Sequence, residues 1–167
     1  MGVNALRRIL VFGNSGSGKS TLAASLVSET VAHLDLDSLA WLPSKPPQRM
    51  PLADSKALID EFASCNESWV IEGCYTDLLE LLADRATEIV FLNLPIALCM
   101  QNAKARPWEP HKYASKEEQD ANLQMLLDWI AQYETRIDEF SLAAHRNFYE
   151  SFSGSKKCIL SNEHSFS

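Results

Sequence analysis

One eight-residue segment constrains this chain more than any other. Residues 13–20 read Gly-Asn-Ser-Gly-Ser-Gly-Lys-Ser, a complete G-x-x-x-x-G-K-[ST] phosphate-binding motif. The apolar run at 8–12 that precedes the motif indicates a buried strand, and the segment 19–28 reads as a helix. Because the motif requires a strand, a glycine loop and a helix in this order, it predicts a parallel α/β sheet.

The residue types of the motif explain how it would hold phosphate. Glycines at 13, 16 and 18 permit positive φ, so successive N–H groups turn inward and, with the helix N-terminus, form an anion site. Lys19 is expected to reach the β- and γ-phosphates, and the Ser20 hydroxyl is expected to bind Mg²⁺. A glycine turn kept for structure, with a solvated lysine, is the alternative. The predicted nucleotide contacts in this loop are Gly13, Asn14, Ser15, Gly16, Ser17, Gly18, Lys19, Ser20 and Thr21.

Strand and helix patterns alternate along the rest of the chain, which is typical of a parallel sheet covered on both faces. We expect strands at 8–12, 31–35, 69–72, 88–94 and 157–160. We expect helices at 19–28, 53–65, 77–83, 96–105 and, as one long broken helix, 116–152. The proline-rich stretch 42–51 reads as an ordered loop. One domain is predicted over 1–167, with a lid at about 104–118 and a polar tail at 161–167.

Charge and cysteine usage narrow the class of protein. The formal net charge of −7 argues against direct nucleic-acid binding, which depends on clustered lysine and arginine. The four cysteines are far apart in sequence, as in a cytoplasmic protein with reduced thiols. No apolar run approaches the length of a membrane span, so we expect no membrane association. The sequence leaves the oligomeric state open.

Acidic residues follow two of the predicted strands. Asp35 and Asp37 close the second strand and Glu72 closes the third, where ligands bind in parallel sheets. We predict that Asp35 is catalytic and helps Ser20 to hold Mg²⁺, while Asp37 and Glu72 bind the acceptor. Capping of a helix by Asp37 or Ser38 and a surface role for Glu72 are the alternatives, and Glu72 is also a candidate for positioning Mg²⁺-bound water. The fourth strand ends in Leu92-Asn93-Leu94. Asn93 stands near the position where many phosphate-loop enzymes carry an acid, which leaves the acidic role to Asp35 or Glu72.

Three arginines are candidates for contacts with phosphate groups. Arg106 lies in the predicted lid and would close over the transferring phosphoryl group as a catalytic residue. Arg49, in the proline-rich stretch, and Arg136, on the long helix, are candidates for binding the acceptor. A solvated basic loop is the alternative for the lid.

Five segments carry a resemblance to known proteins: 13–21, 33–35 with Trp41, 69–75, 89–95 and 129–133. Through them the chain resembles the small phosphate-loop kinases related to adenylate and shikimate kinases. It looks most similar to the adenylate-kinase-like proteins labelled DNA topology modulation proteins, over residues 7 to about 162. The resemblance implies a P-loop NTPase fold, a three-layer α/β/α sandwich with five parallel strands in the order 2-3-1-4-5. It also implies a helical lid, and ATP and Mg²⁺ as cofactors.

The resemblance also implies roles for single residues. In shikimate-kinase-like relatives the first aspartate after the second strand serves Mg²⁺ and the next serves the substrate, which corresponds to Asp35 and Asp37. Residues just after the fifth strand contact adenine, which points to Ser161 and Asn162. Adenylate-kinase-like relatives end the third strand with Asp-Gly-x-Pro-Arg. Here 72–76 read Glu-Gly-Cys-Tyr-Thr, which keeps an acid and lacks the arginine.

The sequence therefore predicts an ATP-binding phosphotransferase that moves the γ-phosphate to a small acceptor, either nucleotide-like or a hydroxylated metabolite. Catalysis would come from positioning and charge stabilisation. The alternative is a nucleotide-binding switch or slow ATPase that acts through a macromolecular partner, and the missing arginine after the third strand favours it.

Overall fold

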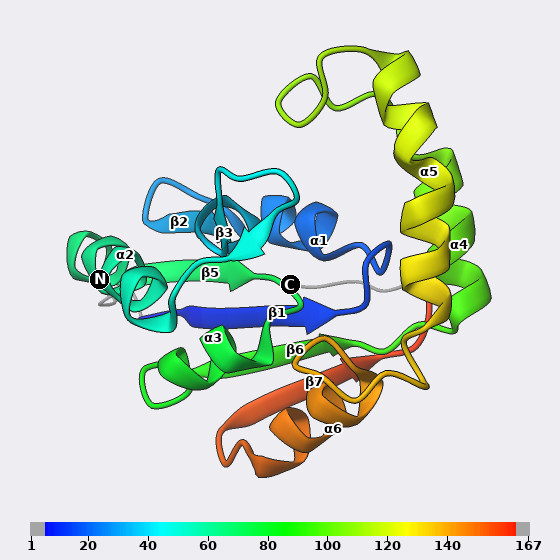
Figure 1. Ribbon diagram of the computed structural model, residues 1–167. Helices are drawn as coiled ribbons and strands as arrows, with labels where there is room; N and C mark the ends of the chain where they lie inside the picture. The colour runs from blue at the N-terminus through cyan, green and yellow to red at the C-terminus, as the bar shows by residue number, and fades with distance from the viewer. Residues whose placement is uncertain (1–5, 163–167) are drawn as a thin grey trace.

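A five-stranded parallel sheet forms the centre of the computed structural model, which describes residues 6–162 (Figure 1). Its strands are β1 (Arg8–Gly13), β2 (Val31–Asp35), β5 (Ser68–Glu72), β6 (Glu88–Leu92) and β7 (Ser155–Ile159). They are hydrogen-bonded in the order β2-β5-β1-β6-β7, and each neighbouring pair is parallel. Counted within the sheet alone, this is the predicted order 2-3-1-4-5, and the predicted α/β class is confirmed.

Helices cover both faces of this sheet. They are α1 (Lys19–Leu26), α2 (Leu52–Cys65), α3 (Thr76–Leu82), α4 (Ile96–Ala105), α5 (Lys116–Ala131) and α6 (Leu142–Ser151), with a short 3-10 helix η1 (Leu36–Leu39). The long broken helix expected over 116–152 is thus two helices, separated by the segment 132–141. Figure 1 shows α4 and α5 side by side, extending beyond the sheet on the side where the phosphate-binding loop lies.

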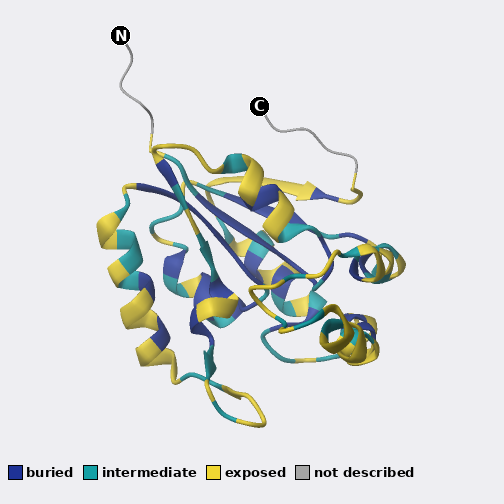
Figure 2. Cartoon of the chain, turned by 90° about the horizontal axis from the view of Figure 1, so that it is seen from above, coloured by how far each residue is buried: buried dark blue, intermediate teal, exposed yellow. Residues whose placement is uncertain are grey.

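Alternation along the strands divides the core into two layers. On β1, Ile9 and Val11 pack with residues of α1, α4 and α5, whereas Leu10 and Phe12 pack with residues of α2, α3 and α6. This follows from the two-residue period of a strand, which sends successive side chains to opposite faces. Figure 2 shows the buried strands enclosed by helices whose outer surfaces are exposed. The central strand β1 is therefore buried on both sides, and it leads directly into the phosphate-binding loop.

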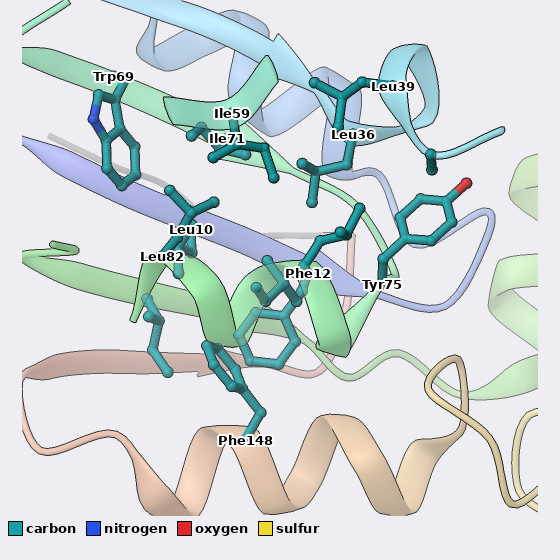
Figure 3. Packing of buried hydrophobic residues seen from close by; sticks show 14 of the residues in the cluster. Leu10, Phe12, Leu36, Leu39, Ile59, Trp69, Ile71, Tyr75, Leu82 and Phe148 are labelled. Atoms are coloured by element: carbon teal, nitrogen blue, oxygen red, sulfur yellow. The ribbon is translucent and has the colours of Figure 1, made fainter. Parts of the chain in front are cut away.

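Phe12 is the aromatic centre of one layer (Figure 3). Its ring stacks on Phe91 at 5.0 Å between centroids and meets the edge of Phe148 from α6 at 5.1 Å. The side chain is fully buried. The packing of Phe12 against Phe148 thus connects β1 to α6 one residue before the phosphate-binding loop begins.

Truncation of Phe12 to alanine is expected to lower the free energy of unfolding by about 3–5 kcal/mol, because it removes a buried ring and leaves a cavity. Urea unfolding of the wild type and F12A measures this loss. Substitution of the exposed Leu58 by alanine serves as the control, with an expected change of less than about 1 kcal/mol. A loss below about 1 kcal/mol in F12A would contradict the packing described for this layer.

Two segments differ from the sequence expectation. The stretch 42–51 is not a plain loop, since β3 (Trp41–Leu42) and β4 (Gln48–Arg49) pair as an antiparallel hairpin. The segment predicted as a helical lid contains the end of α4, a loop over 106–115 and the start of α5, so the loop itself is not helical. Residues 163–167 of the predicted tail lie outside the described residues. Within residues 6–162, no helix has the length and hydrophobicity needed to cross a membrane.

Candidate functional site

The phosphate-binding loop is held in shape by its glycines. Gly13, Gly16 and Gly18 all have positive φ, at 155°, 77° and 91°. A Cβ atom at Gly16 would lie 2.3 Å from the carbonyl oxygen of Cys99, and one at Gly13 would lie 2.5 Å from that of Leu92. The loop is therefore pressed against the end of β6 and against α4, and only glycine fits at these two contacts.

The polar side chains of the loop differ in what they contact. Lys19 Nζ donates to the carbonyl oxygen of Asn14 at 2.8 Å, so the ammonium group lies inside the loop. Asn14 Nδ2 in turn donates to the carbonyl of Ile130 at 3.2 Å, which fastens the loop to the end of α5. Ser17 Oγ is buried and has no hydrogen-bond partner. Lys19 thus lies beside the backbone of the loop, where the sequence predicts the phosphate contacts.

Glu72 lies at the centre of a short hydrogen-bonded chain next to this loop. Ser20 Oγ donates to Glu72 Oε1 at 2.9 Å, and Glu72 Oε2 lies 2.8 Å from His33 Nε2. Glu72 is only 2% exposed, because β5 runs between β1 and β2 and its last residue is in register with Val11 and Asp35. The hydrogen bond to Glu72 raises the pKa of His33 above its ordinary value, against the opposing effect of burial. The sequence left Glu72 as a candidate either for the acceptor or for Mg²⁺-bound water, and in the structure it accepts a hydrogen bond from Ser20.

The raised pKa of His33 predicts a pH-dependent stability. Protonated His33 stabilises the fold below the unfolded value of about 6.5, and this contribution is lost as the pH rises through the higher folded value. The unfolding free energy of the wild type should therefore exceed that of H33Q by more at about pH 6 than at about pH 9. Urea unfolding of both proteins in a chelator measures the difference. A difference that is the same at both pH values would contradict the ion pair.

The two aspartates after β2 have different surroundings. Asp35 Oδ1 accepts the backbone N–H of Asp37 at 2.9 Å and so caps η1. Burial raises the pKa of Asp35, and the nearby Asp37 and Glu72 add to the effect. Asp37 accepts a hydrogen bond from the Tyr75 hydroxyl, which itself accepts from Trp41 Nε1 at 2.8 Å. The capping role that the sequence left open for Asp37 thus belongs to Asp35.

A cavity of about 440 Å³ brings the loop, the strand ends and the 106–115 segment together. Its walls include Lys19 and Ser20 from the loop and α1, Asp37 and Glu72 beyond the strand ends, and Lys112 from the 106–115 segment. A neighbouring cavity of about 370 Å³ runs from Gly16 to Asn102 and Asn162. The structure thus gathers most of the predicted site residues into one pair of cavities.

In the segment between α4 and α5, three basic side chains surround the carboxylate of Glu109. Arg106 Nη1 lies 3.4 Å from Glu109 Oε1, and Lys112 and His111 lie 3.6 and 3.5 Å from Glu109 Oε2. Arg106 borders both cavities, and its catalytic role stays a prediction. Glu109 Oε1 is buried and makes no hydrogen bond, so this carboxylate holds the cations only loosely.

The two arginines predicted for the acceptor have carboxylate partners of their own. Arg49 Nη2 and Nη1 lie 3.0 Å from Asp77 and 3.3 Å from Glu139. Both Nε and Nη2 of Arg136 bind Asp138, at 2.8 and 2.6 Å. Neither guanidinium lines either of the two cavities described above.

Asn162 lies where the adenine contact was predicted. Its side-chain amide exchanges two hydrogen bonds of 3.0 Å with Asn102 on α4, and Asn102 Nδ2 also donates to the carbonyl of Gly16 at 2.8 Å. The predicted residue thus borders the smaller cavity together with the loop. The backbone N–H of Asn93 donates to the carbonyl of Ile159 at 2.8 Å, a link between β6 and β7.

Sequence reasoning missed four residues of this site. His33 precedes Asp35 by two positions on one strand, so alternation places both side chains on the same face of the sheet. The sequence alone could therefore have identified His33 as a candidate site residue. Glu109 is the one acid among the basic residues of 104–112, a second readable signal. No sequence pattern pointed to Tyr75 or Asn102. Their contacts with Asp37 and Gly16 join segments that are far apart in the sequence and meet only in the folded chain.

The oxygens near Ser20 fit a magnesium ion. A hydroxyl and the carboxylate of Glu72 are hard ligands of the type that Mg²⁺ prefers. Within residues 6–162, no group of three or more His, Cys, Asp and Glu side chains is placed to hold a metal ion. A Mg²⁺ ion bound here would therefore use one or two protein oxygens together with phosphate oxygens, the usual arrangement in phosphoryl transfer.

Comparison with known proteins identifies a family and two structures of similar fold. Residues 9–123 match the family described as an AAA domain. No curated protein matches the chain significantly by sequence. The structure is similar to shikimate kinase from Acinetobacter baumannii in complex with shikimate, at 20% identity and a TM-score of 0.52, covering 96% of this chain and 86% of that one. It is also similar to a sugar kinase from Janibacter sp. HTCC2649, at 14% identity and a TM-score of 0.50, covering 93% and 85%. These similarities show a P-loop kinase-like fold.

Proposed function

The chain belongs to the AAA domain family, and from that premise we propose that it is an ATP-dependent phosphotransferase acting on a small hydroxylated acceptor. One observation carries the proposal: the phosphate-binding loop, the acids Asp37 and Glu72, and the cations Arg106 and Lys112 all line a single cavity. Phosphoryl transfer needs a phosphate cradle, positive charge and a group that orients the nucleophile within one enclosed space.

The donor side is formed by the loop and the smaller cavity. Lys19 and the backbone N–H groups of 14–20 would hold the β- and γ-phosphates. The base would lie against Asn102 and Asn162, which border the cavity of about 370 Å³. Arg106 borders both cavities and would stabilise the charge on the phosphoryl group that is transferred.

We assign the metal site to Ser20 and Glu72, which line the larger cavity, whereas Asp35 is not among the residues that line it. The hydrogen bond between Ser20 Oγ and Glu72 Oε1 supports this assignment, as does the place of Glu72 in the cavity wall. Asp35 uses one oxygen to cap η1 and would act through its charge. When bound, Mg²⁺ would neutralise charge on the phosphates and orient them.

Asp37 would position the acceptor hydroxyl. One of its oxygens is fixed by the Tyr75 hydroxyl, and burial keeps the pKa of Tyr75 above its ordinary value, so that the phenol remains a donor. The other oxygen is then available to accept a hydrogen bond from the nucleophilic hydroxyl. The Asp37 carboxylate would orient this hydroxyl as it attacks.

The proposal includes the narrower assignments that the resemblance suggested. We place the chain with the adenylate-kinase-like proteins labelled DNA topology modulation proteins, on the segments 69–75 and 129–133. We also propose a cytoplasmic location, small-molecule substrates and no direct binding to nucleic acid, the last supported by the net charge of −7.

Release of ADP tests the proposal. The protein is incubated with ATP and Mg²⁺, alone and with nucleosides, sugars and hydroxy acids. Acceleration of ADP release by one acceptor, with appearance of its phosphorylated form, would support a phosphotransferase. Slow release that no acceptor accelerates would contradict it and would instead indicate a switch or ATPase.

A further inference from the structure

We infer that the acceptor of this enzyme carries no negative charge: it is an uncharged or cationic hydroxylated compound, and neither a nucleotide nor a carboxylic acid. This inference rests on the proposed function, and it deepens it by naming the substrate class. It follows from how the arginines and carboxylates beyond Asp37 are paired.

A wall of aromatic rings lies behind Asp37. Trp41 Nε1 donates to the Tyr75 hydroxyl, which donates to Asp37. Phe140 packs on Tyr75 with centroids 5.2 Å apart, and Trp129 packs on Phe140, also at 5.2 Å. We name Trp41, Tyr75, Trp129 and Phe140 the aromatic wall. Arg49 and Arg136, the two arginines predicted for the acceptor, both lie against this wall.

Arg49 is held on this wall by its own partners. Its guanidinium carbon lies 4.9 Å from the centre of the Tyr75 ring and 5.5 Å from that of Phe140. Nε donates to the carbonyl of Ala40 at 3.2 Å, and the two terminal nitrogens bind Asp77 and Glu139. All three nitrogens of Arg49 therefore have hydrogen-bond partners, and its positive charge is compensated by two carboxylates. The side chain thereby connects the β3–β4 hairpin to α3 and to the 132–141 segment.

Arg136 is held in a similar way. Its guanidinium carbon lies 3.5 Å from the centre of the Trp129 ring, and Asp138 binds it through two parallel hydrogen bonds. These bonds lower the pKa of Asp138, as expected for a carboxylate fully paired with arginine. Nη1 is buried without a partner. It can donate to an uncharged oxygen, but the positive charge of the group is already compensated.

The charges around the acceptor position therefore favour a substrate without negative charge. The guanidinium groups of Arg49 and Arg136 are paired with three carboxylates, those of Asp77, Asp138 and Glu139. Two further carboxylates, those of Asp37 and Glu72, lie on the cavity wall. The cations that line the cavity are Lys19, Arg106 and Lys112, which belong to the loop and the 106–115 segment and would be engaged by the donor phosphates. A second anion beside Asp37 would be repelled by the carboxylates and would lack an uncompensated cation.

Sulfate titration tests the inference without knowledge of the acceptor. The protein is first saturated with Mg²⁺ and the non-hydrolysable ATP analogue AMP-PNP, which fills the phosphate cradle, and sulfate binding is then measured by calorimetry. Wild type is expected to show no saturable sulfate binding. Asp138→Asn keeps the side-chain size and frees the charge of Arg136, so it should gain a sulfate site. Arg49 has two carboxylate partners, so the double variant Asp77→Asn/Glu139→Gln should do the same for Arg49. Asp128→Asn, whose carboxylate accepts only from Gln124, is the matched control and should behave as wild type.

The possible results distinguish failure of the inference from failure of the proposed function. Saturable sulfate binding to the wild type that Arg49→Gln or Arg136→Gln removes would overturn the inference. Failure of both Asp138→Asn and the double variant Asp77→Asn/Glu139→Gln to gain a site would overturn it as well. Failure to bind AMP-PNP would instead overturn the proposed function.

A kinetic comparison uses two matched series: glucose, glucosamine and glucuronate, and adenosine and AMP. In any series that is phosphorylated, kcat/KM for the anionic member should be at least about tenfold lower than for the uncharged or cationic one. An anionic member that is the better acceptor would contradict the inference. If neither series is phosphorylated, the sulfate result decides.

Discussion

Replacing Lys19 with alanine is expected to lower phosphoryl transfer by about 10³-fold while the chain remains folded. The ammonium group is the cation placed inside the loop, where it donates to the carbonyl of Asn14 at 2.8 Å. A bound triphosphate would offer it charged oxygens instead, and such contacts strengthen as negative charge moves during transfer. The side chain is only partly buried, so its loss costs little stability.

Steady-state kinetics with the acceptor found in the ADP-release assay measures this loss, and calorimetry measures AMP-PNP binding. Lys56→Ala is the matched control, because Lys56 pairs with Asp60 on the outer face of α2. Urea unfolding should give K19A and K56A stabilities within about 1 kcal/mol of the wild type. A K19A enzyme that transfers phosphate at the wild-type rate would exclude the role proposed for the loop.

The fold was predictable because its signals are local. The motif at 13–20 requires a strand before it and a helix after it, and the short apolar runs between polar segments marked the strands of a buried parallel sheet. The ends of α4 were predicted to the residue, since Pro95 begins the helix and Pro107 follows its end. The β3–β4 hairpin was missed because each of its strands has two residues, too few for a pattern.

The candidate site was less predictable, because its contacts join distant parts of the chain. Alternation places a strand-end acid near the cleft but does not say which neighbour it meets. Asp35 turned out to cap η1, and Glu72 met Ser20, because β5 lies between β1 and β2. The sequence likewise could not show that Arg49 is neutralised by Asp77 and Glu139, which are 28 and 90 positions away.

These pairings suggest how the two halves of the site differ. Positive charge is concentrated on the loop and on the 106–115 segment, where Arg106 and Lys112 are held only loosely by Glu109. Bonds to a phosphate group would be shorter and stronger than these contacts of 3.4 and 3.6 Å. Beyond Asp37 the arginines are instead tightly paired and stacked on rings. On the ATP side, Arg106 and Lys112 can therefore exchange Glu109 for phosphate oxygens. On the acceptor side, the arginines keep their carboxylate partners.

Glu72 is the residue on which the metal assignment depends, and Glu72→Gln is expected to lower phosphoryl transfer by about 10²-fold. Glutamine keeps the size of the side chain but removes its negative charge and one of its two acceptors. The hydrogen bonds to Ser20 and His33 occupy both oxygens of Glu72. The amide nitrogen of glutamine cannot accept either bond, so at least one of them must reverse its direction or break. The concentration of Mg²⁺ needed for half-maximal activity should rise as well, because a charged ligand near the ion has gone.

Two measurements separate this role from a purely structural one. In the metal-free protein, the pKa of His33 followed by NMR should fall in E72Q, because the hydrogen bond to Glu72 is the largest cause of its increase. Glu88→Gln is the control, since Glu88 pairs with Arg7 at the opposite end of the sheet and should leave both the Mg²⁺ requirement and the His33 pKa unchanged. If E72Q lowers the pKa of His33 but leaves the Mg²⁺ requirement at the wild-type value, Glu72 orients the strand end and the ion is held elsewhere. Because Ser20 and Glu72 share a hydrogen bond, we expect the two effects to appear together.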